Sequence, residues 1–313
     1  MRRSRALLVA TVMVLVGVAT ALSAPSGAMM VDLGDWSSAT RVEDAAGTDP
    51  AFNGPSLDGC PFIAPDSKMF FMASTRPGGL GGIDIWMSTR ASEADPWGAP
   101  VNVGAPVNSS ANDFCPTIAR DGKTFYFVSN RAGTCGGDDV YVSRRRTDGW
   151  DEPVNLGCDT AGGPNSSANE AGPFPINEPH SGPTIYFSST RAGTNDLYRS
   201  ESHGGVFGPA DLIEELSSPA QDGQPNLRRD GLEIFFFSNR PGSLGNDIYS
   251  ATRASTADAW SAPVNLGPAV NSDASETRPS LSWDGTTLYF GSNRAGGEGD
   301  NDHYVSVRLA HPA

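Results

Sequence analysis

The sequence has little of what most enzyme families display. It contains only two lysines, Lys68 and Lys123, and four scattered histidines in 313 residues. It has no G-x-S-x-G, H-E-x-x-H or Walker motif, so it lacks the signatures of the common serine hydrolases, zinc proteases and P-loop enzymes. His303 replaces an aliphatic residue of a repeated pattern, and we predict that it is a packing variant. No stretch after residue 28 shows a convincing helical period, so we expect an all-β domain.

Cysteine is also scarce, and all four cysteines lie between residues 60 and 158. An even number in an exported chain favours two disulfides, and we predict Cys60–Cys115 and Cys135–Cys158, with the other two connectivities left open. No C-x-x-C pair is present, so we expect no structural metal, and no motif points to a cofactor.

The first 28 residues have the order of a secretory signal. Three arginines precede an apolar run from Ala6 to about Ala21, and small residues follow. We predict a signal peptide over residues 1–28, cleaved near Ala28, and therefore a secreted or periplasmic protein. The alternative is an uncleaved single-pass anchor, because the run approaches the length that spans a bilayer. No later segment is apolar enough to insert into a membrane.

Positive charge is rare in what remains. Removing residues 1–28 leaves 19 Lys and Arg against 36 Asp and Glu, a formal charge of −17. Such a chain repels nucleic acid and anionic membrane surfaces, so we expect neither as a partner.

A single pattern recurs five times along the chain. An aromatic run such as FYFVS (125–129) leads into Ser-Asn-Arg or Ser-Thr-Arg, a glycine-rich loop, and an Asp two residues before an aromatic. A Trp-x-x-Pro segment such as WDEPVNLG (150–157) follows in three repeats, and FGPADLI (207–213) takes its place in a fourth. The motif arginines lie 49 to 60 residues apart. A period of this length is typical of repeat architectures.

Each repeat is predicted to form four short strands, with a tight turn such as Asp121-Gly122 between the first two. Four-stranded antiparallel units repeated around an axis make a β-propeller. We therefore predict a single five-bladed propeller over residues 29–313. The last repeat lacks a Trp segment, whereas Trp36 precedes the first repeat, so we expect an N-terminal strand around Trp36 to complete the last blade.

These motifs resemble a known family. Asp113-x-x-Pro116, Asp121-Gly122, FYFVSNR and GGDDVYVS are similar to the TolB-like, or WD-like, propeller repeat of bacterial exported proteins. The resemblance covers roughly residues 55–308. The third repeat departs most, because it carries three extra residues and lacks the Asp-Gly turn. The resemblance implies a secreted or periplasmic propeller that binds partner proteins or cell-envelope material, although some relatives form part of enzymes.

The Arg and Asp of each repeat are predicted to be scaffold. A catalytic site needs one asymmetric cluster, whereas this pair occurs in every repeat. We expect each Arg to bridge its own loop by bonding the Asp or nearby carbonyls. The predicted clamps are Arg76 with Asp84, Arg131 with Asp139, Arg191 with Asp196, Arg240 with Asp247, and Arg294 with Asp302.

The two faces of the predicted propeller differ. Loops between second and third strands lie on the same side as the linkers between blades, and we name this side the long-loop face. The opposite side, which carries the hairpin turns, is the tight-turn face. Since loops carry function more often than tight turns, we expect a binding site on the long-loop face.

One acid also stands three residues before the first-strand Pro of each repeat. These acids should ring the mouth of the central channel, where they either cap backbone N–H groups or face a ligand or cation. The ligand-binding candidates are Asp58, Asp113, Glu170, Asp222 and Glu276.

Two functions compete, ahead of a third, a structural or signalling propeller attached to a larger envelope system. The favoured one is a monomeric, non-catalytic binding propeller that contacts a protein or an extracellular or cell-envelope glycan through the long-loop face. The alternative is a carbohydrate-active hydrolase or lyase that uses channel-mouth carboxylates. Glycoside cleavage needs two carboxyls about 5–10 Å apart in unlike environments, and acids that are alike in every repeat argue against it. The sequence names no catalytic residue and no ligand.

Overall fold

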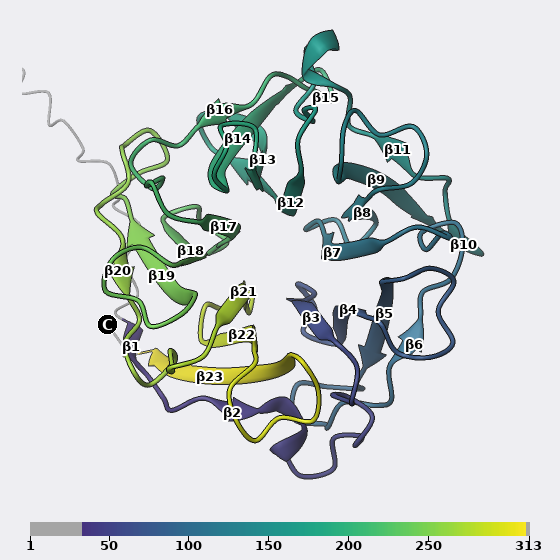
Figure 1. Cartoon of the computed structure of the whole chain (residues 1–313), viewed down its shortest axis with the longest axis vertical. Helices are drawn as coiled ribbons and strands as arrows, with labels where there is room; N and C mark the ends of the chain where they lie inside the picture. Colours follow the sequence, from purple (N-terminus) through teal and green to yellow (C-terminus); the bar gives the residue numbers. More distant parts are fainter. Residues whose placement is uncertain (1–32, 311–313) are drawn as a thin grey trace, which may run out of the picture.

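Each repeat forms one antiparallel sheet, and the five sheets lie radially around a central axis (Figure 1). The computed structural model describes residues 33–310, so the predicted signal peptide lies outside the described residues. The five-bladed, all-β architecture predicted from the repeats is confirmed. Within the described residues, no helix is long and apolar enough to cross a membrane.

The blades follow one another along the chain. Blade 1 contains β3 (Asp58–Ile63), β4 (Met69–Ser74), β5 (Asp84–Thr89) and β6 (Val101–Asn102). Blade 2 contains β7 (Asp113–Ile118), β8 (Thr124–Ser129), β9 (Asp139–Arg146), β10 (Gly149–Trp150) and β11 (Val154–Asn155). Blade 3 contains β12 (Glu170–Glu178), β13 (Gly182–Ser189), β14 (Asp196–His203), β15 (Val206–Phe207) and β16 (Asp211–Leu212). Blade 4 contains β17 (Asp222–Leu227), β18 (Glu233–Ser238), β19 (Asp247–Thr252) and β20 (Val264–Asn265).

Blade 5 joins the two ends of the chain. Its inner strands are β21 (Glu276–Leu281), β22 (Thr287–Ser292) and β23 (Asp302–Ala310), and its outer strands are the N-terminal β1 (Leu33–Trp36) and β2 (Thr40–Arg41). Both outer strands pair antiparallel with β23 (Figure 1). The predicted closure is confirmed, and it covers an edge that would otherwise leave backbone groups unpaired.

The hydrophobic core lies between neighbouring blades. The aromatic runs form the second strand of each blade, and their rings are almost fully buried, as at Phe70, Phe125, Phe187, Phe236 and Phe290. Burying a ring of this size stabilises the fold by about 1.5–3 kcal/mol. Two 3-10 turns, Val42–Asp44 and Asp159–Ala161, are the helical elements among the described residues.

Candidate functional site

The five motif arginines bind the acids that begin the inner strands. Arg240 Nη2 donates to Asp222 Oδ1 at 2.5 Å and to the Leu216 carbonyl at 2.8 Å. Its Nε donates to Ser238 Oγ at 2.9 Å, and its guanidinium lies 5.1 Å from the Tyr249 ring centroid. The same arrangement recurs in every blade, as the ion pairs Arg76–Asp58, Arg131–Asp113, Arg191–Glu170 and Arg294–Glu276.

The expected pairing of each Arg with the Asp of its own loop is therefore corrected. Asp84 accepts hydrogen bonds from the Leu80 and Gly81 N–H groups and from Asn102 Nδ2 at 2.8 Å. The loop thus already satisfies this carboxylate, while the arginine, leaving the end of β4, reaches the neighbouring strand β3. The nearby carbonyls that we also expected as acceptors do bind each arginine, as the Phe52 carbonyl binds Arg76 at 3.0 Å. The loop acids Asp139, Asp196, Asp247 and Asp302 lie at positions equivalent to Asp84, and burial raises the pKa of each.

The five ring acids have the geometry of caps. Asp58, Asp113, Glu170, Asp222 and Glu276 each begin an inner strand, and each is 0 % exposed. The second oxygen of each carboxylate binds the preceding linker. Asp113 Oδ2, for example, accepts from the Ser109 N–H at 2.6 Å and from Ser109 Oγ at 2.7 Å. Since the arginine and the linker occupy both oxygens, these carboxylates hold the linker to the blade.

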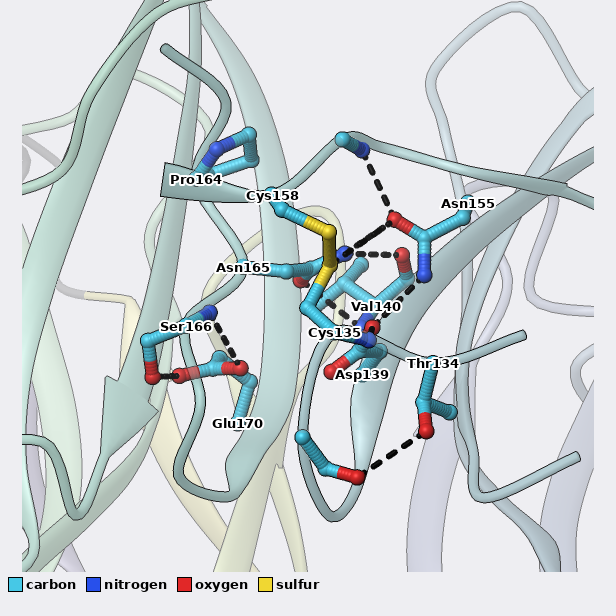
Figure 2. Close-up of a disulfide and its surroundings, with 12 residues drawn as sticks. Thr134, Cys135, Asp139, Val140, Asn155, Cys158, Pro164, Asn165, Ser166 and Glu170 are labelled. Atoms are coloured by element: carbon cyan, nitrogen blue, oxygen red, sulfur yellow. Dashed lines mark hydrogen bonds between the residues drawn. A yellow bond between two sulfur atoms is a disulfide. The ribbon is translucent and has the colours of Figure 1, made fainter. Parts of the chain in front are cut away.

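Both predicted disulfides are present. Cys60–Cys115 joins the inner strands β3 and β7, and Cys135–Cys158 joins a glycine-rich loop to the linker that follows blade 2. Figure 2 shows the second disulfide beside the Asn155 and Asn165 amides, with the Ser166–Glu170 pair nearby. It therefore fastens the long-loop face at the boundary between blades 2 and 3.

The position that differs between repeats lies two residues after the ring acid on each inner strand. A β-bulge precedes the repeated Pro, and the residue before that Pro has positive φ in every blade. A bulge re-aims a side chain, and here the bulged residues line the channel. Non-glycine residues rarely adopt positive φ, and such strain is concentrated at functional sites. The residues, with their φ values, are Cys60 (47°), Cys115 (48°), Gly172 (59°), Gln224 (54°) and Arg278 (59°).

Arg278 is the charged residue of this channel ring. It is partly exposed, and none of the hydrogen bonds or ion pairs among the described residues involves its guanidinium. Burial lowers its pKa to about 10, so it stays protonated at neutral pH. A methyl group on Gly59 would collide with Arg278 Nη1, which shows that the guanidinium lies directly on this glycine.

Gln224 supplies a second polar group in the same ring. Its Nε2 lies 3.5 Å from Cys115 Sγ, and its buried Oε1 has no hydrogen-bond partner in the described part of the chain. The channel cavity that these side chains line has a volume of about 30 Å³, room for a few atoms rather than a sugar ring. A ligand would therefore sit on the long-loop mouth and reach Arg278 and Gln224 with one polar group.

The mouth offers a guanidinium and amides rather than an acid pair. Among the residues that line the described cavity there is no carboxylate. The described residues also contain no group of three or more His, Cys, Asp or Glu that could hold a metal ion. Asp138 immediately precedes β9 and lies next to blade 3. Its backbone carbonyl accepts from the Glu170 N–H at 2.8 Å, and burial raises the pKa of its side-chain carboxyl. The guanidinium and amides that line the channel suit hydrogen bonding to a polar or anionic group.

Sequence reasoning missed Gly172, Gln224 and Arg278. Attention to what recurs selected the acids and arginines, which are the same in every blade. The useful signal was variation: the residue before the repeated Pro is Cys, Cys, Gly, Gln and Arg in turn.

Comparisons with known proteins support the fold. No family model and no curated protein matches the chain, so membership of the TolB-like family remains a prediction. The catalytic domain of a GH62 α-L-arabinofuranosidase from Coprinopsis cinerea aligns with a TM-score of 0.56, at 14% identity over 88% of this chain and 98% of that one. The α-L-arabinofuranosidase from Lactobacillus brevis aligns with a TM-score of 0.53, at 13% identity over 86% and 94%.

A structure described as TolB from Agrobacterium tumefaciens aligns with a TM-score of 0.49, at 16% identity over 90% of this chain and 100% of that one, which is too weak to support an argument. At these identities the alignments show a shared propeller fold, on which different functions are built.

Proposed function

We propose that this protein is an exported propeller that binds carbohydrate over the long-loop mouth of its central channel. The observation that carries the proposal is the asymmetric channel ring, in which Arg278 has no partner for its guanidinium among the described residues. The hydroxyl or carboxylate oxygens of a saccharide would accept from Arg278, and Gln224 Oε1 would accept from a hydroxyl. The small cavity selects a protruding group, while the rest of the saccharide contacts the surrounding loops.

The fold neighbours support carbohydrate over protein as the ligand. Several aligned structures are glycoside hydrolases named for arabinose- or xylose-containing substrates. They fit a carbohydrate-active protein better than a protein-binding module. The two disulfides support export, because such bonds persist in oxidising compartments.

Hydrolysis is the second candidate, and the same neighbours favour it. Asp138 is a candidate proton donor, because the equivalent positions hold Ile83, Asn195, Asn246 and Asn301 in the other blades and burial raises its pKa. A glycosidase also needs a second carboxyl about 5–10 Å away. The five ring acids are bound on both oxygens, so none of them is free for this role without breaking an arginine pair.

The experiment is to incubate the purified chain lacking residues 1–28 with arabinan, xylan and acidic polysaccharides, and to measure both retention and released sugars. Retention without products supports binding. Products that disappear in Asp138→Asn support hydrolysis instead. Neither retention nor products with any polysaccharide contradicts a carbohydrate function.

A further inference from the structure

The tight-turn face has its own repeated element, an arginine stacked on tryptophan. The arginine is the sixth residue after the Asp that begins the third strand. Arg90 lies 4.2 Å from the Trp97 ring, and Arg253 lies 4.1 Å from Trp260. In each case Nε donates at 2.7 Å to the carbonyl of the residue that ends the hairpin turn, Ser67 or Gly231. Arg308 on Trp36 and Arg145 on Trp150 are the equivalents in blades 5 and 2.

Blade 3 is the exception. The equivalent positions hold Ser202 and Phe207, which pair across β14 and β15. Phe207 packs edge-on against Tyr126 of blade 2, with ring centroids 6.2 Å apart. Replacement of both Arg and Trp by smaller side chains leaves space between these two blades.

Two adjoining hollows occupy that space. The outer hollow, which reaches Val154 of β11, has a volume of about 350 Å³, and the inner hollow, which reaches Ile176 of β12, about 340 Å³. Both are lined by Thr124, Tyr126, Arg144, Gly205 and Phe207. Each exceeds the channel cavity about tenfold and falls in the range of small-molecule sites. Together they form a groove, which we name the blade 2–3 groove.

The groove has an aromatic wall with a free hydroxyl. Tyr186, at the equivalent position in blade 3, donates from its hydroxyl to Glu178 at 2.8 Å. Tyr126 has no such partner among the described residues, and it lines both hollows. Burial raises its pKa to about 12, so the hydroxyl stays protonated and can donate.

The groove also has cations that are not neutralised by ion pairs. Arg144 is exposed, lines both hollows, and forms no ion pair within the described chain. Arg120 lines the inner hollow, and Lys123 lies beside Arg144 on an adjoining surface. Three acids also line the hollows: Asp121, which accepts from Thr124 Oγ1 at 2.6 Å, Asp151, which pairs with Arg146 at 2.7 Å, and Glu152. In addition to these bonds, Arg144 lowers the pKa of Asp121 and Asp151 but lies beyond ion-pair distance of both, so its donors are free for a ligand.

We propose that the blade 2–3 groove is a second binding site, which takes a sugar ring bearing a carboxylate. The sugar's apolar face would pack on Phe207, and its carboxylate would accept from Arg144 and Arg120. Thr124 and the Tyr126 hydroxyl would bind ring hydroxyls. The site lies on the face opposite the long-loop mouth and is independent of the function proposed there.

The test is calorimetric titration of the chain lacking residues 1–28 with trigalacturonate and with its methyl ester, which has the same rings without the charges. We expect Arg144→Gln to weaken trigalacturonate binding on the order of tenfold and Tyr126→Phe to weaken it about threefold. Esterification should weaken binding to the wild type on the order of tenfold. Arg199→Gln is the matched control, since Arg199 lies on β14 of blade 3 but lines neither hollow.

Four results would overturn the inference. They are no binding of trigalacturonate, equal binding of the ester, equal losses in Arg199→Gln and Arg144→Gln, or binding that is lost in Arg278→Gln and kept in Arg144→Gln. The last result would place the uronate in the channel and leave the proposed function standing. Failure at the long-loop mouth, with the groove variants behaving as expected, would refute the proposed function alone.

Discussion

Replacing Arg240 by Ala tests whether the repeated arginines hold the fold. Arg240 pairs with Asp222 at 2.5 Å, and the Asp222 side chain is fully buried. The substitution would leave a buried carboxylate with Ser218 Oγ but without its cation, and it would also free the Leu216 carbonyl. Breaking a buried pair by removing one partner costs about 3–5 kcal/mol. For a domain of this size, that corresponds to a fall in Tm of roughly 6–20 °C.

Thermal melting followed by circular dichroism measures the effect. The control is Arg146→Ala, which breaks an exposed pair with Asp151 and should leave Tm unchanged. The double variant Arg240→Ala/Asp222→Asn should recover part of the loss, because the uncompensated charge is gone. An Arg240→Ala protein that melts like the wild type, but no longer binds saccharide, would refute the scaffold role of these arginines.

Three further predictions concern stability. His303 is buried, and desolvation lowers its pKa to about 4, so the unfolded state binds a proton that the folded state resists, and the free energy of unfolding should fall by about 3 kcal/mol as pH drops from about 6.5 to about 4. His303→Ile, which restores the aliphatic residue of the other blades, should remove this part of the pH dependence in urea titrations, and an unchanged pH profile would contradict it. Replacing both Cys135 and Cys158 by Ser opens a link across 23 residues and should cost roughly 3 kcal/mol by denaturant unfolding, whereas an unchanged midpoint would show that the linker is held without it. Deleting residues 29–45 removes both strands that pair with β23 and should abolish cooperative melting. A truncated protein that melts at the wild-type temperature would show that blade 5 is stable without β1 and β2.

The fold was predictable because the same strand and turn pattern occurs five times in the sequence. Aromatic alternation, Asp-Gly turns and an unmatched Trp36 were enough to predict the blades and their closure by β1 and β2. The partner of each arginine was not predictable from the sequence, because a side chain as long as that of Arg76 can reach either Asp58 or Asp84. The hydrogen bonds within the loop decide between these two acids.

The sites were harder to predict for a related reason. The channel ring depends on a bulge that turns Arg278 towards the axis, and no local sequence motif predicts this bulge. The blade 2–3 groove depends on Ser202 and Phe207, whose significance appears only when the stacked Arg–Trp pairs of the other blades are known. In a repeat protein, positions that break the pattern are therefore better candidates for function than those that keep it.

The most direct test of the proposed function is binding by the Arg278→Gln variant. Gln keeps a side chain that tolerates the channel position, as Gln224 does, but removes the charge. The polysaccharide that the wild type retains, released as a defined oligosaccharide, would be titrated calorimetrically into both proteins at matched Tm. The account predicts that Arg278→Gln weakens binding on the order of tenfold or more, because it loses a charge-assisted hydrogen bond in a confined site. Equal affinity in the two proteins, with both folded, would contradict it.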